Sequence, residues 1–379
     1  MSGPILPGAT LGILGGGQLG RMTAMAARSL GYHVHALDPD PSCAARHVAE
    51  RCFTAAFDDV AAAEELGKSS SVVTVEIEKI SLEAMAAAAR HAPVRPGAAV
   101  LRVVQDRARQ KAWLRDHGFP LGPYREAASE VELAAVLEEL GTSCFVKTCS
   151  GGYDGGGQAR ARGLVEAPRT WQALGEQPLV AERELDLEAE LSVLVARSPS
   201  GGVAIYPPAL NHHEQRILTW SVIPGPLPEA VSARAQEIAG EIARALGVEG
   251  LLVVEMFLTR QGELFVNELA PRPHNSFHAT EVACLTSQFE QVVRAVCDLP
   301  LGLTEVVRPA AIANLLGDLW LGPRPPAFDR ALALPGIRLH LYGKRVPRPG
   351  RKMGHLSASG KTPEEAVRQV LEARSRLSD

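Results

Sequence analysis

Apolar runs that predict buried strands alternate with stretches of helical spacing through the first hundred residues. The predicted strands are residues 10–14, 33–37 and 71–77, and the predicted helices are residues 18–30, which stop at Gly31, and the alanine-rich residues 81–91. Strands that alternate with helices in this way predict a parallel sheet with helices on its faces. Residues 93–97 follow as a boundary, and residues 101–117 predict one further helix.

The rest of the chain mixes strands and helices without this regular alternation. The predicted strands are residues 143–148, 179–181, 188–197, 203–206, 310–315 and 337–341, and the predicted helices are residues 229–246 and a terminal helix from about Thr362. Residues 150–157 form a glycine-rich loop, and residues 343–355 form a basic, turn-rich stretch. The pattern therefore predicts a parallel-sheet region followed by mixed α+β regions.

A hairpin in the last third of the chain carries the strongest chemical signal. Residues 251–257 and 264–269 predict two strands joined by a turn centred between Gln261 and Gly262, which sets Glu255 opposite Glu268. Facing carboxylates repel each other across two strands. Two carboxylates and phosphate oxygens commonly hold Mg²⁺, so a cation between them accounts for the pair. The alternative is a hairpin face whose glutamates point into water.

A glycine turn near the N-terminus has more than one interpretation. Residues 15–20 fit G-x-G-x-x-G, follow a predicted strand and open a predicted helix, and Asp38 ends the next strand. This is the pattern of a dinucleotide site. Backbone N–H groups at a helix N-terminus can equally bind the phosphate of another ligand. A tight turn without a ligand is the third interpretation.

Two further features are typical of phosphate or anion binding. Lys147 ends a predicted strand and precedes the glycine loop, so it can offer its charge to nucleotide phosphates beneath a closing loop. A surface lysine beside a flexible loop is the alternative. The stretch 343–355 holds six basic groups when His355 is counted, and it is either a solvated basic rim or a site for an anionic substrate.

Length and composition narrow the functional classes. With 379 residues the chain is long enough for two or three domains, and its net charge of −4 gives no general case for nucleic-acid binding. No run approaches the length of a transmembrane span, and the N-terminus lacks a secretory signal pattern. The six cysteines form no C-x-x-C pair and no metal spacing. We therefore expect a cytoplasmic protein with reduced cysteines, without a membrane or nucleic-acid partner.

Taken together, the motifs resemble the ATP-grasp superfamily and, within it, the N5-carboxyaminoimidazole ribonucleotide synthetases of purine biosynthesis. The resemblance is carried by LGGGQLGRM (14–22), LDPD (37–40), QDR (105–107), GGYDG (151–155) with Gln158, ELSV (190–193), residues 267–272 with His274, Asn275 and Ser276, and PGRKMGH (349–355). It runs nearly end to end.

The resemblance implies a multidomain fold of α/β and α+β type. It divides the chain into an N-terminal Rossmann-like parallel-sheet domain (1–104), an ATP-grasp domain (105–300) with a lid subdomain at about 121–186, and a small C-terminal domain (301–379). The implied enzyme is an ATP-dependent ligase, a homodimer, that uses ATP, bicarbonate and Mg²⁺ to carboxylate the exocyclic amine of 5-aminoimidazole ribonucleotide. Carboxyphosphate is the implied intermediate.

The resemblance also implies roles for individual residues. The implied nucleotide contacts are Arg107, Lys147, Gly152, Tyr153, Asp154, Gly155, Gly156, Gly157, Gln158, Glu182, Arg183, Glu184, Leu185, Glu190, His213, Asn267 and Glu268. The implied metal ligands are Glu255 and Glu268. The implied ribonucleotide and bicarbonate contacts are Gln18, Tyr153, Asp154, Arg272, Asn275, Lys344, Arg351 and Lys352. Asp154, Lys352 and Arg272 are the implied catalytic groups, with Asp154 accepting the amine proton.

Three positions depart from the family pattern. The family usually has arginine at the position of Gly156, glycine at Phe277, and a glycine near His213 where this chain has Arg216. The first departure removes an implied ribonucleotide contact, for which Arg216 or another basic group could compensate.

Three alternative functions stay open at this point. A formate-dependent glycinamide ribonucleotide transformylase or a biotin carboxylase would share the ATP half, but PGRKMGH argues against both. An NAD oxidoreductase would use the glycine turn and Asp38, but it leaves Lys147 and the Glu255/Glu268 pair unexplained. A nucleotide-binding protein without catalysis is indicated by Gly156 and Phe277.

Overall fold

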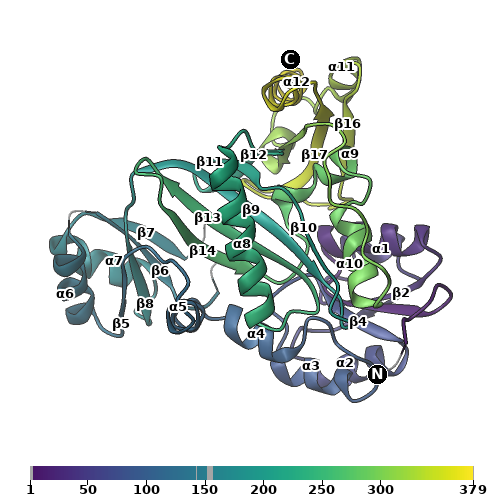
Figure 1. Ribbon diagram of the computed structural model, residues 1–379, viewed down its shortest axis with the longest axis horizontal. Helices are drawn as coiled ribbons and strands as arrows, with labels where there is room; N and C mark the ends of the chain where they lie inside the picture. Colours follow the sequence, from purple (N-terminus) through teal and green to yellow (C-terminus); the bar gives the residue numbers. More distant parts are fainter. Residues whose placement is uncertain (1–2, 142, 152–156, 379) are drawn as a thin grey trace.

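The computed structural model describes residues 3–141, 143–151 and 157–378 of the chain, and three sheets organise this part of the molecule (Figure 1). The N-terminal sheet has the order β3-β2-β1-β4 and is parallel throughout. Its strands are β1 (Thr10–Leu14), β2 (His33–Asp38), β3 (Arg51–Thr54) and β4 (Val72–Val75), and the neighbouring helices are α1 (Gln18–Ser29), α2 (Val60–Lys68), α3 (Leu82–Ala89) and α4 (Ala98–Val104). The predicted parallel sheet is confirmed.

A nine-stranded antiparallel sheet, here called the central sheet, forms the middle of the molecule (Figure 1). Its order is β14-β13-β9-β11-β12-β15-β17-β16, with β10 paired to β9. The strands are β9 (Leu187–Arg197), β10 (Val203–Ile205), β11 (Ala209–Glu214), β12 (Ile217–Ile223), β13 (Gly250–Thr259), β14 (Leu264–Ala270), β15 (Ala310–Leu316), β16 (Arg338–Leu341) and β17 (Lys352–Ser359).

Both faces of the central sheet are covered near β9 and β13, which explains the apolar runs at residues 193–196 and 251–254. Leu252 and Val254 pack with helix α8 (Glu229–Ala245) on one face. Leu251 and Val253 pack on the other face with α1 and helix α10 (Gln288–Val296). Because side chains alternate along a strand, Glu255 belongs to the second face.

A smaller antiparallel sheet, here called the lid sheet, lies beside the central sheet at one end of the molecule (Figure 1). Its order is β5-β8-β6-β7, with β5 (Tyr124–Ala127), β6 (Cys144–Thr148), β7 (Gln158–Ala161) and β8 (Leu179–Arg183). Helices α6 (Glu130–Leu140) and α7 (Ala167–Ala173) pack on it, and helix α5 (Arg107–Asp116) contacts β8.

The C-terminal segment completes the central sheet. Strand β15 pairs with β12 and with β17, so hydrogen bonds continue across residue 300. Helix α12 (Pro363–Ser375) packs on β12, β15 and β17, and α11 (Phe328–Leu332) packs on α12. The remaining short helices are α9 (Thr280–Ala283) and the 3₁₀ turns η1 (Ala44–His47), η2 (Leu164–Glu166), η3 (Asn275–Phe277) and η4 (Gly317–Trp320).

The prediction of one helix over residues 101–117 is wrong, because two helices occupy this segment. Helix α4 ends at Val104 and α5 begins at Arg107. Asp106 stands between them as an N-cap, and its carboxylate accepts a hydrogen bond of 2.8 Å from the Arg109 N–H. The break puts Arg107 at the start of α5. Several strands were not predicted, among them β3, β5, β7, β11 and β12. Within the described residues, no helix combines the length and apolar character needed to span a membrane.

Candidate active site

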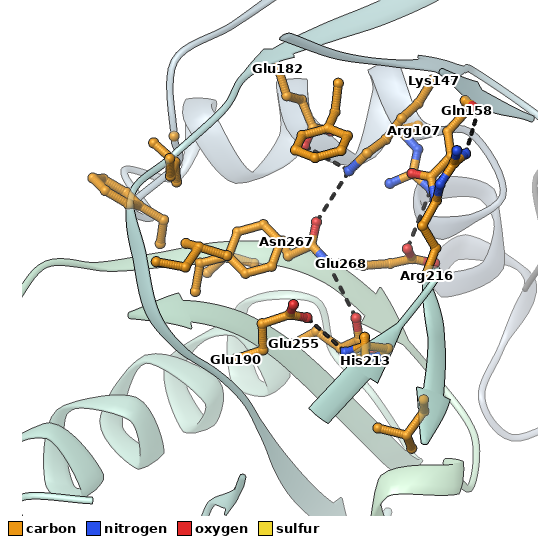
Figure 2. A pocket seen from close by; sticks show the side chains of 18 of the residues that line it. Arg107, Lys147, Gln158, Glu182, Glu190, His213, Arg216, Glu255, Asn267 and Glu268 are labelled. Atoms are coloured by element: carbon orange, nitrogen blue, oxygen red, sulfur yellow. Dashed lines mark hydrogen bonds and ion pairs between the residues drawn. The ribbon is translucent and has the colours of Figure 1, made fainter. Parts of the chain in front are cut away.

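A cavity of about 480 Å³ lies between the lid sheet and the central sheet, with α1 and α5 contributing to its walls (Figure 2). Most of the described candidate residues line it: Gln18, Arg107, Lys147, Gly157, Gln158, Glu182, Arg183, Glu184, Leu185, Glu190, His213, Glu255, Asn267, Glu268, Arg272, Asn275 and Lys352. Lys344 and Arg351 are not among the lining residues. Gly152, Tyr153, Asp154, Gly155 and Gly156 lie outside the described residues.

The two glutamates of the hairpin face each other in the cavity. Glu255 of β13 is the register partner of Glu268 of β14, as the sequence predicted. The pairs from Val253 to Glu255 are centred between Gln261 and Gly262 as predicted, whereas the pairs nearer the turn, such as Phe257 with Phe265, are centred on Gln261. A bulge at Asn267 shifts the register by one residue between these two sets of pairs. It also turns Asn267 and Glu268 together toward the cavity, where plain alternation would separate them.

Glu255 of this pair is in an unfavourable electrostatic environment. Burial, followed by repulsion from Glu268, raises the pKa of Glu255 to about 7. The Asn267 amide donates to Glu255 over 3.3 Å, and the His274 Nε2 lies 3.3 Å from the other carboxylate oxygen. Burial holds the pKa of His274 well below its ordinary value, so this imidazole is neutral. A cation between the two glutamates would relieve the repulsion.

Cationic side chains line the opposite wall (Figure 2). Lys147 at the end of β6 lies 2.8 Å from the Glu182 carboxylate, and Lys111 of α5 lies 3.2 Å from it. Burial alone would raise the pKa of Glu182, but these two ammonium groups lower it to about 2. Arg107 reaches Glu268 over 3.3 Å and links the two walls.

A second polar group lies on β9 and β11. His213 Nδ1 is 2.9 Å from the Glu190 carboxylate. Burial lowers the pKa of His213, but the hydrogen bond and charge of Glu190 outweigh burial and raise it overall. Glu190 and His213 are therefore an ion pair in weakly acidic solution, on the same side of the cavity as Glu255 (Figure 2).

Three N–H groups of the glycine turn are already bound by carboxylates of the protein. The Asp38 carboxylate accepts from Gly16 N–H over 2.7 Å. The Glu76 carboxylate accepts from Gly17 and Gly20, each over 2.8 Å. The interpretation of this turn as a phosphate cradle, whether for a dinucleotide or another ligand, is therefore wrong for these three N–H groups. Asp38 closes the turn instead of reading a ribose.

The wall near the glycine turn holds the remaining candidate residues. Arg272 is buried and lies 2.8 Å from the carboxylate of Glu78, a partner that the sequence did not indicate. Asn275 is buried, and neither polar atom of its side chain has a hydrogen-bond partner among the described residues. A buried amide left without partners beside a cavity indicates a place for a polar ligand.

The end of the basic stretch 343–355 belongs to strand β17. Lys344 donates to the Gln18 side chain over 2.6 Å and to the Lys352 carbonyl over 2.8 Å. Lys352 begins strand β17 and lines the cavity. His355, counted among the six basic groups of this stretch, is not part of an exposed basic rim. Its side chain is fully buried, and burial holds its pKa well below the ordinary value, which leaves it neutral.

The sequence did not indicate the apolar wall or Lys111. The apolar lining includes Phe145, Leu187, Phe257 and Phe265. Two-residue periodicity could have found some of these, because Phe145 precedes Lys147 by two positions and Phe257 follows Glu255 by two. Helical periodicity could have found Lys111, which lies four positions after Arg107.

A second group with metal-ligating side chains lies outside this cavity. Ligand atoms of Glu281, His340 and His355 lie within 4.8 Å of one another. His340 Nδ1 is 3.3 Å from Glu281, and His355 Nδ1 is hydrogen-bonded to the Tyr342 hydroxyl over 2.8 Å. The second ring nitrogen of His355, Nε2, has no hydrogen-bond partner among the described residues.

Comparison with known proteins matches three family models along the chain. Residues 8–105 match the ribonucleotide synthetase preATP-grasp domain, residues 112–289 the ATP-grasp domain, and residues 310–369 the phosphoribosylaminoimidazole carboxylase C-terminal domain. The N5-carboxyaminoimidazole ribonucleotide synthase of Bacillus subtilis (strain 168) is 38% identical over 97% of this chain and 95% of its own length. The chain belongs to the N5-carboxyaminoimidazole ribonucleotide synthase family.

Other members of the N5-carboxyaminoimidazole ribonucleotide synthase family agree. The synthase of Brucella melitensis is 41% identical over 93% of this chain and 96% of its own length. A crystal structure of a synthetase in complex with ADP superposes with a TM-score of 0.92 at 37% identity and covers 100% of both chains. The Aspergillus clavatus synthase in complex with ADP and 5-aminoimidazole ribonucleotide has a TM-score of 0.89 at 32% identity, covering 97% of this chain and 98% of its own. The predicted fold class and family are confirmed.

Proposed function

We propose that this protein carboxylates the exocyclic amine of 5-aminoimidazole ribonucleotide, with ATP and bicarbonate as co-substrates, to give N5-carboxyaminoimidazole ribonucleotide, ADP and phosphate. The observation that carries the proposal is the content of one cavity. Two facing carboxylates, those of Glu255 and Glu268, lie opposite a cluster of cations there, beside a buried amide that has no hydrogen-bond partner among the described residues. The family and the ligands named for its solved structures support the same activity.

The lid-sheet side of the cavity suits the nucleotide. Lys147 and Arg107 are placed to bind phosphate oxygens, and the Glu182–Leu185 segment with the apolar wall suits the adenine ring. Glu190 and His213 are assigned to the ribose end. The carboxylates that now pair with Lys147 and Arg107 hold these cations in place before the nucleotide arrives.

Glu255 and Glu268 suit Mg²⁺, since burial and the repulsion from Glu268 raise the pKa of Glu255 and the Asn267 amide lies beside both. The ion would supply charge neutralisation on the nucleotide phosphates. The chain's own residues position the reactants and exclude water.

The reaction divides into two steps in this scheme. A bicarbonate oxygen attacks the γ-phosphoryl group of ATP, ADP leaves, and carboxyphosphate forms. Arg272 and Lys352 lie on the wall where they can bind the negative charge that develops. Carboxyphosphate releases CO₂ and phosphate, and the amine of the ribonucleotide attacks the CO₂ carbon.

The amine must lose a proton as the new bond forms. We assign this proton to Asp154, which lies outside the described residues. Gln18, Tyr153, Asn275, Lys344 and Arg351 are assigned to binding of the ribonucleotide, with Lys344 acting through its contact with Gln18. The protein is further assigned to the cytoplasm and to a homodimer, in keeping with its family.

Steady-state release of ADP tests the function directly. ADP is measured with Mg-ATP and bicarbonate, in the presence and absence of aminoimidazole ribonucleotide. We expect strong stimulation by the ribonucleotide, and this stimulation should require bicarbonate. Nucleotide binding without stimulated turnover would overturn the proposed acceptor.

Asp154→Asn should retain nucleotide binding and lower turnover by about 10²-fold or more, the usual contribution of a general base.

A further inference from the structure

The turn between β11 and β12 holds two residues in an unfavourable backbone conformation. Glu214 pairs with Ile217, so the loop consists of Gln215 and Arg216 alone. Both have positive φ, at 48° and 68°. Two-residue turns of this kind strongly favour asparagine and glycine, because a larger L side chain clashes with the backbone there. Glycine in place of Arg216 would remove this strain.

The Arg216 side chain reaches from the central sheet to the lid sheet. Its Nη1 donates to the Gln158 carbonyl over 2.8 Å, and Arg216 lines the cavity (Figure 2). Gln158 begins β7 and is the register partner of Lys147. The guanidinium therefore lies at the rim of the cavity, close to the strand position that carries the phosphate-binding lysine.

The charge of Arg216 differs in its surroundings from four other cations that line the cavity. Lys147 and Lys111 contact Glu182, Arg107 contacts Glu268, and Arg272 contacts Glu78. Arg216 has no ion pair with a carboxylate among the described residues, and a single carbonyl takes one of its five N–H groups. A guanidinium in this state retains N–H groups that match phosphate oxygens in geometry and charge.

Strain kept at a cavity rim points to a function for the side chain that causes it. We propose that Arg216 binds a phosphate group of a bound substrate while its contact with Gln158 holds the start of β7. The inference rests on the proposed function, because that function supplies two phosphate-bearing ligands, ATP and the ribonucleotide. The guanidinium–phosphate contact is the shared chemistry, and the experiment separates the two sources.

The experiment compares Arg216→Gly, Arg216→Lys and the matched control Gln215→Gly. Gln215→Gly relieves the same kind of strain one position earlier and leaves the guanidinium in place. Each variant is assayed for thermal unfolding, for KM and kcat with each substrate, and for binding of Mg-ADP, Mg-ATP and aminoimidazole ribonucleotide by calorimetry.

Arg216→Gly should unfold at the same or a higher temperature than the wild type, because the strained position becomes glycine. Its KM and dissociation constant for one phosphate-bearing ligand should rise by about tenfold or more, as expected for a lost charge-assisted hydrogen bond. The change in kcat should be smaller. Arg216→Lys should recover part of the affinity, and Gln215→Gly should keep wild-type KM values.

The ligand whose affinity falls identifies the source. Weaker Mg-ATP binding assigns Arg216 to the triphosphate, and weaker Mg-ADP binding in addition assigns it to the α- or β-phosphate. A loss confined to aminoimidazole ribonucleotide assigns it to the 5′-phosphate. Unchanged affinities for all three ligands in Arg216→Gly would overturn the inference. Absence of ribonucleotide-stimulated ADP release in the wild type would overturn the proposed function, while the binding measurements still test Arg216.

Discussion

The partly buried carboxyl of Glu255 lines the cavity and has the wrong charge for its surroundings when it is ionised. Its pKa is raised to about 7 by burial and by Glu268, whereas an unfolded chain would give it an ordinary value. The folded protein therefore binds more protons than the unfolded chain between about pH 4.5 and 7. This group makes the fold less stable as the pH rises through that window, and the penalty is fully present above it.

Glu255→Gln should consequently stabilise the protein at pH 8 without Mg²⁺, by roughly 1–3 kcal/mol, because the repulsion with Glu268 is removed. The same variant should lose most of the thermal stabilisation that Mg²⁺ gives the wild type, and most of the turnover. Thermal unfolding with and without Mg²⁺ checks both effects. Glu263→Gln, an exposed change in the turn of the same hairpin, is the matched control. A destabilised Glu255→Gln that still responds fully to Mg²⁺ would contradict the assignment.

Local sequence was sufficient to find some of these side chains and insufficient for others. The facing glutamates follow from the symmetry of one hairpin, and Lys147 follows from its place at the end of a strand. The partners Glu182, Glu78 and Glu76 could not be predicted in their present roles. Each meets a residue from a distant segment, as Lys147 does with Glu182 across the lid sheet. Asn275 likewise gains its meaning only from the cavity around it.

Secondary-structure elements in this protein are shaped by single polar residues. Asp106 divides an apparently continuous helix in two, and the bulge at Asn267 re-aims two side chains of β14. Neither feature changes the apolar periodicity, which is why the pattern predicted one long helix and a plain hairpin. The strand β17 was missed for a related reason. Its first residues, Lys352 to His355, carry the polar groups expected of a turn.

The junction of β16, β17 and η3 encloses a set of neutral histidines. Burial lowers the pKa of His278 and of His355 well below the ordinary value. The Gln288 amide nitrogen is hydrogen-bonded to His278 Nδ1 over 3.0 Å, and the Tyr342 hydroxyl is hydrogen-bonded to His355 Nδ1 over 2.8 Å. His340 also faces this group and its pKa is lowered mainly by burial, while the pKa of Glu281 is raised to about 7, chiefly by burial.

Acidification should destabilise this junction. Below about pH 6.5 the unfolded chain protonates His278 and His355 and the folded protein does not, so stability falls as the pH falls. Glu281 acts in the opposite direction between about pH 7 and 4.5, because its folded form binds the proton more tightly. His278→Gln should therefore reduce the fall in melting temperature between pH 7.5 and 5.5, whatever its effect at pH 7.5.

The measurement is thermal unfolding across this pH range, compared as slopes. His47→Gln changes an exposed histidine outside the junction and should keep the wild-type slope. If His278→Gln has the wild-type slope as well, the buried histidines are not the source of acid sensitivity.

At the scale of the whole molecule, sheet pairing connects segments that the family pattern assigns to separate domains. The boundary at residue 300 is a prediction from the family resemblance, and hydrogen bonding continues across it from β12 to β15. Ala310 and Ile312 of β15 lie in the same core cluster as Leu194 and Ile223. Composition and motif spacing cannot reveal such continuity, because strand order within a sheet depends on contacts between distant segments.

A chain ending at residue 300 should therefore fail to fold cooperatively. Removal of β15 exposes the edge of β12 along four register pairs, from Trp220 to Ile223, and opens the core beneath it. An exposed apolar edge strand promotes aggregation. We expect the fragment to lack a sharp thermal transition and a near-ultraviolet circular dichroism signal, and to bind no ADP. Supplying residues 301–379 as a separate chain should restore part of the thermal transition and part of the near-ultraviolet signal, since the missing strand can then pair with β12. A fragment that unfolds sharply and binds ADP unaided would instead establish residues 1–300 as an independent folding unit.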